Sequence, residues 1–304
     1  MPTTAPTSAA EAGPAPLAGS RLTVPALPVL ATSLRVCHPV TLHARHTDTA
    51  GSPPPVTVPL ATRVPGYRAG EWFVATSGVW AGRTLPMSAL CPETDYAPGT
   101  DIHHLDHQQV MVATQTRGTT GTYQGSWARW EWRDGTKSWA SVGDTSVVVQ
   151  FGRNGVQDGL TRVQGSGTTP AGTYRIPFAF GVGAPTGTRI EYRTVDRCSW
   201  WIGRDGLATG EYNRWKQDCT RSYSDAEYLP TYVATGQYRQ AAVIGFNYDD
   251  PRIAYGPGSG SAIFLHYNDL GKATAGCVAL TSMAELTATV AWLDPARSPV
   301  IVIR

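Results

Sequence analysis

The sequence has little charge, no excess of either sign and no long apolar run. Only 16% of its 304 residues are charged, and the formal net charge is +2. No cluster of Lys or Arg forms the basic stripe that nucleic-acid binding needs, which argues against nucleic acid as a partner. The best apolar candidate, residues 24–31, contains two prolines and is far shorter than the roughly 20 residues that span a bilayer. We therefore expect no membrane span.

The first residues also lack the features of a secretory signal. Residues 1–20 have neither a basic start nor an apolar central region, so an export signal has either been removed or is replaced by another route. Residues 1–33 consist mainly of Ala, Pro, Thr and Ser, which bury too little surface to offset the chain entropy lost on folding. They are predicted to form a disordered leader.

Turn-forming and aromatic residues are abundant. The chain holds 32 Gly, 23 Pro, 10 Trp and 13 Tyr, a composition typical of short strands joined by tight turns, and mostly β structure is expected. Alternating apolar runs predict a small β-barrel over residues 34–92, a polar linker over residues 93–108 and a second β domain over residues 109–304. In the second domain, Ser282 and Glu285 form a capping box, which predicts a short helix there.

Five cysteines indicate the compartment, because an odd count in an exported protein suggests disulfides plus one free thiol. Local pairing joins Cys198 to Cys219 and Cys37 to Cys91, and it leaves Cys277 free. The alternative is five reduced, buried thiols in a cytosolic protein. The first interpretation predicts an extracytoplasmic protein, either secreted or associated with the cell wall.

Three histidines in the predicted linker, His103, His104 and His107, lie close to Asp101 and Asp106. A metal site needs ligands held at a fixed spacing, which this polar stretch does not promise, and short exposed His clusters occur without a ligand. No metal and no cofactor are therefore predicted.

The stretch that carries chemistry lies between residues 261 and 280. An apolar run, predicted to be a strand over residues 261–266, ends at His266, and a polar turn leads to Gly276 and Cys277. A thiol nucleophile and its base can be assembled from adjacent strands in this way, as a thiolate–imidazolium pair. The backbone N–H groups of Gly276 and Cys277 are candidate oxyanion donors, and Thr274 is a candidate to orient the turn. The alternative is a small buried cysteine and a hydrogen-bonded core histidine.

Aromatic side chains are dense between residues 197 and 228, a segment that the predicted disulfide between Cys198 and Cys219 closes in part. Two interpretations remain open: a lid over the site, or a secondary core beneath a surface loop. The aromatic residues concerned are Trp200, Trp201, Tyr212, Trp215, Tyr223 and Tyr228.

Two motifs resemble the catalytic domain of L,D-transpeptidases, a family that cross-links bacterial peptidoglycan with a cysteine. One is His266 followed by Thr-Ala-Gly-Cys at residues 274–277, and the other is the Thr-Pro-x-Gly-x-Tyr pattern ending at Tyr174. The resemblance covers residues 109–304 and implies a β-sandwich-like domain. In addition, residues 71–90 resemble the closing strands of a bacterial SH3-like cell-wall module, which implies attachment or spacing.

The resemblance implies acyl transfer between peptidoglycan stem peptides, one as donor and one as acceptor. Cys277 attacks the carbonyl of the third residue of a tetrapeptide stem and expels D-alanine, and His266 acts as base and then acid. An amine of a second stem resolves the acyl-enzyme into a 3→3 cross-link, or water gives carboxypeptidase activity. Carbapenem β-lactams are expected inhibitors. Residues 212–215 resemble an element of actinobacterial members.

Further residues are predicted to contact substrate or to support the catalytic pair. These residues are Thr274, Asn213, Tyr212, Asn247 and Ser261.

Three departures from the family pattern stand beside these matches. Ala275 replaces the histidine usual two places before the cysteine, the turn between His266 and Cys277 is short, and residues 278–280 are apolar where a polar residue is common. These departures leave open which acceptor the protein uses and how fast the acyl transfer runs. A cysteine peptidase or amidase acting on the same wall, and a catalytically silent wall-binding module, are the competing functions.

Overall fold

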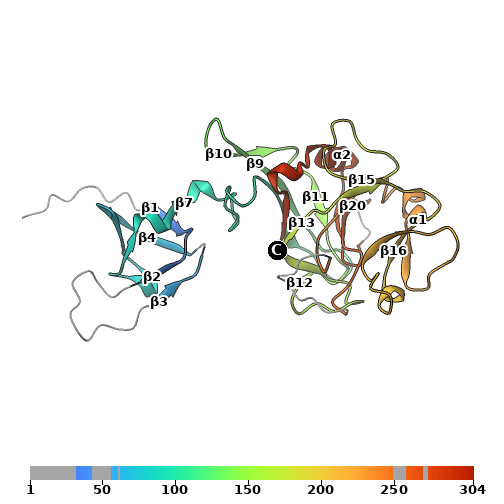
Figure 1. The fold of residues 1–304 in the computed structure, drawn as a ribbon, viewed down its shortest axis with the longest axis horizontal. Coiled ribbons are helices and arrows are strands. Elements are labelled where there is room, and N and C mark those ends of the chain that lie inside the picture. Colours follow the sequence, from blue (N-terminus) through green and yellow to red (C-terminus); the bar gives the residue numbers. More distant parts are fainter. Residues whose placement is uncertain (1–31, 43–55, 61, 249–257, 270–272) are drawn as a thin grey trace, which may run out of the picture.

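The computed structural model describes residues 32–42, 56–60, 62–248, 258–269 and 273–304, and most of the predicted leader, residues 1–33, lies outside them. Among the described residues the protein is mostly β, as predicted, with two α-helices. Figure 1 shows a small sheet and a large sheet as separate bodies, joined by the segment that runs through residues 93–108. No described helix is long and apolar enough to cross a membrane.

The first body is a five-stranded antiparallel sheet in the order β6-β5-β4-β1-β7. Its inner face buries Val36, Val64, Phe73 and Leu85 completely. Successive side chains of a strand point to opposite faces of the sheet. In the strand of residues 63–69, the exposed Arg63 and Pro65 alternate with the buried Val64 and Gly66. The strands are β1 (Thr32–Val36), β4 (Arg63–Ala69), β5 (Trp72–Ala75), β6 (Thr84–Pro86) and β7 (Leu90–Pro92), with the pair β2 (Val40–Leu42) and β3 (Val56–Val58) beside them.

The predicted linker, residues 93–108, packs against other parts of the protein, whereas its polar composition predicted an exposed segment. His103 is buried, pairs with Tyr96 in a β-bridge and packs edge-on against its ring, while His104 stacks on Trp132 at 3.9 Å between centroids. The backbone carbonyl of Asp95 accepts a hydrogen bond from Trp139. Aromatic partners from the second body therefore bury this segment, which local composition cannot reveal.

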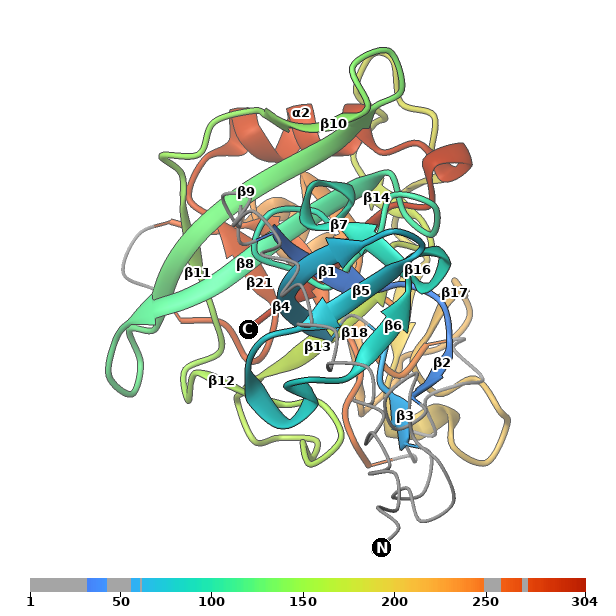
Figure 2. The same ribbon diagram turned by 90° about the vertical axis from the view of Figure 1, so that its left-hand side faces the viewer.

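The second body is built on a mixed twelve-stranded sheet. The order is β12-β13-β22-β8-β9-β11-β21-β20-β19-β14-β15, and β10 pairs with β9. The long strands β8 and β9 run side by side in Figure 2. The strands are β8 (Gln109–Arg117), β9 (Gln124–Arg133), β10 (Ser138–Val142), β11 (Val148–Gln150), β12 (Val156–Asp158), β13 (Thr169–Arg175), β14 (Ala179–Gly181), β15 (Tyr192–Thr194), β19 (Gln240–Val243), β20 (Phe264–Tyr267), β21 (Val278–Leu280) and β22 (Val300–Ile303).

A smaller sheet and two helices complete this body. The sheet has the order β17-β16-β18, and helix α1 follows β18 directly and packs on β16 (Figure 1). Helix α2 begins after Ser282, whose Oγ accepts a hydrogen bond from Glu285 N at 3.2 Å as predicted. The Glu285 carboxylate instead accepts from Trp127 and Arg129, so the second half of the predicted capping box does not form. The elements are β16 (Ser199–Ile202), β17 (Arg214–Gln217), β18 (Ala226–Tyr228), α1 (Leu229–Ala234) and α2 (Met283–Trp292).

Both predicted disulfides are present: Cys37 bonds to Cys91, and Cys198 bonds to Cys219. Cys277 is therefore the one free thiol of the chain, and it is buried. The prediction of a strand over residues 261–266 was wrong at its start, because β20 begins only at Phe264. Ala262 has φ 57°, a left-handed conformation that no strand accommodates.

Candidate active site

Cys277 and His266 come from two adjacent parallel strands. In the register of β20 and β21, Leu265 pairs with Val278 and His266 pairs with Ala279, so Cys277 lies level with Phe264. The backbone N–H of Phe264 donates to Cys277 Sγ at 3.4 Å. Because side chains two residues apart on a strand share a face, the side chain of His266 lies on the same face as the thiol.

A pocket of about 180 Å³ opens on this face. Four predicted site residues line it, Cys277, His266, Thr274 and Ser261. The remaining predicted contacts, Asn213, Tyr212 and Asn247, do not line it. Two residues that sequence reasoning missed, Glu227 and Tyr238, complete part of the wall.

The Cys277 thiol is buried and protonated in the free protein. Burial, and after it the charge of Glu227, raise its pKa to about 12, while the Phe264 amide, the Arg162 charge and the Tyr238 hydroxyl act in the opposite direction. The thiol donates to the carbonyl of Ala262 at 3.3 Å. At neutral pH the sulfur is therefore a thiol rather than a thiolate.

The His266 ring has one nitrogen that is able to accept a proton. Its Nδ1 lies 2.7 Å from the carbonyl of Tyr267, and because a carbonyl only accepts, Nδ1 carries the hydrogen and Nε2 holds a free lone pair. Burial lowers the pKa of His266 to about 4, so the imidazole is neutral. The free protein thus holds a neutral thiol and a neutral imidazole, which differs from the thiolate–imidazolium pair expected from the sequence, because burial disfavours both charges.

Threonine hydroxyls hold the turn that carries the cysteine. Thr274 Oγ1 donates to the carbonyl of Cys277 at 2.7 Å, and Thr169 Oγ1 lies 3.3 Å from the same oxygen. Thr169 belongs to the Thr-Pro motif noted in the sequence, so that motif supports the turn that carries Cys277, although Thr169 was not among the predicted site residues. The predicted orienting role of Thr274 agrees with this geometry.

The two candidate oxyanion donors differ. The Gly276 N–H donates to Thr274 Oγ1 at 3.2 Å and is therefore already engaged. Gly276 has φ 149°, and a Cβ there would lie 2.8 Å from Arg162 Nη2 and 2.9 Å from the carbonyl of Thr168. Glycine is required for the conformation and for this close approach. Among the described residues the Cys277 N–H has no acceptor, which leaves it available to a substrate oxygen.

Asn213 supports the pocket by holding the backbone of Ala262, which lines it. It is buried, its Oδ1 accepts hydrogen bonds from Trp201 Nε1 at 2.8 Å and from Ala262 N at 3.0 Å, and its Nδ2 donates to the carbonyls of Phe246 and Asn247. With every polar atom engaged inside the protein, Asn213 is not free to bind substrate. It fixes Ala262, whose carbonyl contacts the thiol.

Tyr212 and Asn247 brace the neighbouring loop. The Tyr212 hydroxyl donates to Gln164 Oε1 at 2.8 Å, and Asn247 Nδ2 donates to the carbonyl of Gly260 at 2.8 Å. Gly260 directly precedes Ser261, the member of this group that reaches the pocket. Both residues therefore act on the pocket through the backbone that leads into β20.

A buried arginine beside the turn was not predicted. Arg162 donates to the carbonyls of Thr168 and Ser259 at 2.7 and 2.6 Å, and no carboxylate among the described residues pairs with it. Burial lowers its pKa, while the nearby Cys277 acts to raise it. The sequence offers no local signal for this residue, because its place depends on contacts with chain nearly 100 residues away.

Part of the dense aromatic segment belongs to a core, with Trp201 inside it and Trp215 packed against it, while the half-buried Trp200 contacts Tyr223 and Tyr228 outside that core. Trp201 is 1% exposed and packs in one cluster with Phe264, Tyr238 and Cys277. Edge-to-face contacts join these rings, with centroids 4.8 Å apart between Trp201 and Phe264. For Trp201 and Trp215, the secondary core is the better of the two interpretations left open by the sequence. Glu227 of β18 lines the pocket beside them.

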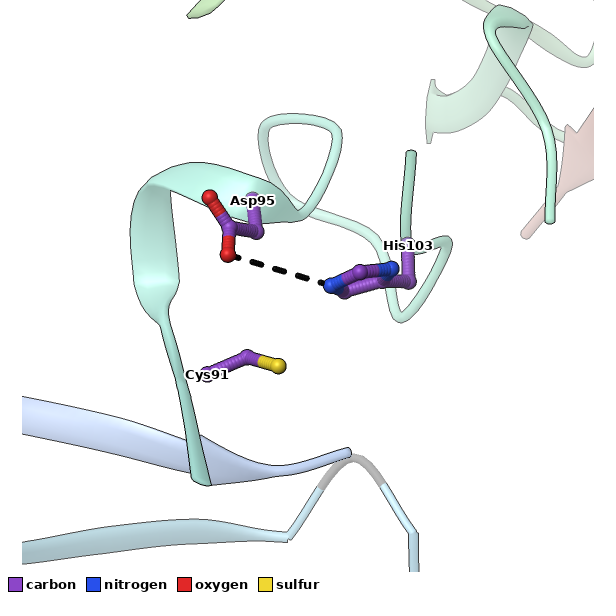
Figure 3. A group of neighbouring side chains, drawn as sticks. All are labelled: Cys91, Asp95 and His103. Atoms are coloured by element: carbon purple, nitrogen blue, oxygen red, sulfur yellow. Dashed lines mark ion pairs between the residues drawn. The ribbon is translucent and has the colours of Figure 1, made fainter. Parts of the chain in front are cut away.

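A second group of polar side chains lies where the first body meets the segment of residues 93–108. Cys91, Asp95 and His103 offer donor atoms within 4.8 Å of one another (Figure 3). The sulfur of Cys91 is bonded to Cys37, so it is not a thiolate ligand. His103 Nδ1 accepts from Leu105 N at 3.2 Å, which places the remaining proton on Nε2 and leaves that atom no lone pair for a cation. This donor set does not fit a metal.

Comparison with known proteins identifies the second body. No curated protein and no solved structure matches the chain. A family model described as the L,D-transpeptidase catalytic domain (YkuD) matches residues 107–302, well over half of the chain. The matched region contains the parallel pair β20 and β21 with the thiol and imidazole on one face. The chain therefore belongs to the L,D-transpeptidase family.

Proposed function

We propose that this protein uses Cys277 for acyl transfer on peptidoglycan stem peptides. The observation that carries the proposal is the placement of the one free thiol and an imidazole with a free Nε2 in the same pocket. Membership of the L,D-transpeptidase family and two disulfides support an enzyme of the cell wall that works outside the cytoplasm.

The first half-reaction forms a thioester. Cys277 Sγ attacks the carbonyl carbon of the third stem residue, a diamino acid, as its proton passes to His266 Nε2. The Cys277 N–H stabilises the oxygen that gains charge. The tetrahedral intermediate then expels the amine of D-alanine, which takes the proton from His266. Because the thiol starts protonated, proton transfer and attack occur together.

The second half-reaction releases the acyl group. The side-chain amine of another stem attacks the thioester and gives a 3→3 cross-link, or water attacks and gives a carboxypeptidase product. The pocket of about 180 Å³ is small, so it holds the reacting groups while the rest of each stem lies outside it.

Release of D-alanine from a defined tetrapeptide stem tests the proposal. Wild-type protein is expected to release it, and Cys277→Ala is expected to release none, with Cys277→Ser as a control of similar size. A product cut elsewhere in the stem would indicate a peptidase or amidase instead. Binding to cell-wall sacculi without any product would indicate a silent module.

Intact mass after incubation with meropenem gives a second test. A carbapenem opens on a nucleophilic cysteine, so one adduct per chain on wild type and none on Cys277→Ala is expected. Absence of an adduct on the wild-type protein would contradict the proposal, since it needs Cys277 to attack a carbonyl.

A further inference from the structure

Glu227 is an acidic group inside the pocket with the nucleophile. It lies on β18 opposite Trp201, and its side chain lines the same cavity as Cys277 and His266. Its Oε2 accepts a hydrogen bond from the Tyr238 hydroxyl at 2.9 Å, and the Tyr238 ring packs edge-on against His266 with centroids 5.3 Å apart. The carboxyl group is thus held by a rigid aromatic residue, with Oε1 facing no other donor among the described residues.

The surroundings of Glu227 differ from those of its neighbours. Between residues 197 and 228, Glu211 pairs with Lys216, and Asp218 pairs with Arg221. Among the described residues no cationic side chain forms an ion pair with Glu227. Burial raises its pKa to about 7, so a substantial fraction is charged at neutral pH.

This charge opposes the first half-reaction. After burial, Glu227 is the main cause of the raised pKa of Cys277, because a carboxylate near the sulfur disfavours the thiolate. A carboxylate there also repels the terminal carboxylate of the donor stem. Once the thioester has formed the sulfur is neutral, and the same charge no longer opposes the chemistry. The carboxylate therefore suits the second substrate, whose amine is a cation in solution.

We propose, on the basis of the function proposed above, that Glu227 binds the ammonium group of the amine acceptor and takes its first proton. The nitrogen then attacks the thioester carbonyl, and the C–N bond forms as the C–S bond breaks. The second proton of the nitrogen passes through His266 Nε2 to the leaving sulfur, which restores the Cys277 thiol. Glu227 returns its proton to solvent when the product leaves, and Tyr238 holds Oε2 throughout.

The partition of one acyl-enzyme between amine and water tests this role. Tetrapeptide donor is mixed with a diamino-acid acceptor, and mass spectrometry gives the ratio of amide product to hydrolysed product. For Glu227→Gln the ratio is expected to fall about tenfold, which is about 1.4 kcal/mol. Both products come from the same thioester, so the ratio does not depend on the folded fraction. Glu211→Gln is the matched control and keeps the wild-type ratio.

Hydroxylamine, which is neutral at the assay pH, separates binding of a cation from a merely structural role. Glu227→Gln is expected to keep the wild-type ratio with hydroxylamine and to lose it only with the cationic amine. An unchanged ratio with the diamino acid, or an equal fall with both nucleophiles, would overturn the proposal for Glu227. Failure of the wild-type protein to release D-alanine would instead refute the proposed function itself.

Discussion

Replacing Asn213 tests how the pocket is held together. Asn213→Ala removes the acceptor of Trp201 Nε1 and of Ala262 N, two buried donors that cost about 1–3 kcal/mol each when left unpaired. Asn213 also has φ 58°, a left-handed conformation that costs an alanine about 1–2 kcal/mol. The free energy of unfolding should therefore fall by about 3–8 kcal/mol.

Asn213→Gly provides the matched comparison. Glycine adopts positive φ without strain but supplies no side-chain hydrogen bond, so it should be more stable than Asn213→Ala by the strain alone, about 1–2 kcal/mol. Chemical denaturation followed by tryptophan fluorescence measures both values.

The same replacement should also slow acylation. Ala262 loses its anchor, and its carbonyl, 3.3 Å from Cys277 Sγ, no longer holds the thiol in place. The rate of meropenem adduct formation on the folded fraction of Asn213→Gly is expected to fall about tenfold. A loss of stability below about 1 kcal/mol with wild-type acylation would refute the structural role assigned to Asn213.

Three further predictions concern charge. Because burial and Glu227 raise the pKa of Cys277, thiolate is scarce at pH 7, so alkylation of Cys277 by iodoacetamide should keep rising with pH above about 9; a plateau near neutral pH would indicate an ion pair. Arg162→Met removes a cation that favours the thiolate, so the rate of D-alanine release should fall about tenfold. Arg162→Lys keeps the charge and should retain more activity. Equal activities of the two variants would contradict an electrostatic role. Glu285→Gln breaks the buried ion pair with Arg129 (2.7 Å) and should lower the free energy of unfolding, measured by chemical denaturation, by about 3–5 kcal/mol. The rate of D-alanine release by the folded protein should change little. An unchanged free energy of unfolding would show that the pair is dispensable.

Local signals in the sequence predicted what depends on neighbouring residues. Ser282, recognised as a helix cap, located the start of α2. The cysteine spacing predicted both disulfides and isolated Cys277. Each of these features rests on a short pattern or on simple counting.

Features that depend on distant segments were not predictable in this way. Glu227 reaches the pocket only because the small sheet folds against β20 and β21, and Arg162 lies beside the Cys277 turn only because the loop before β13 does the same. The left-handed conformation of Ala262 has no signature in a residue that usually avoids it. The place of Asn213 inside the protein, rather than in contact with substrate, was not predictable for the same reason. Its four side-chain hydrogen bonds join three segments that are remote in the sequence.

The position of β22 has a consequence for how the second body folds. This strand lies between β13 and β8 and pairs in parallel with β8, although almost the whole second body separates the two in the sequence. The pairing of β22 with β8 therefore closes a very long loop, and topologies with such non-local pairing fold slowly. Until β22 inserts, β8 and β13 each expose an unpaired edge, so the newly made chain is most prone to aggregation at this stage.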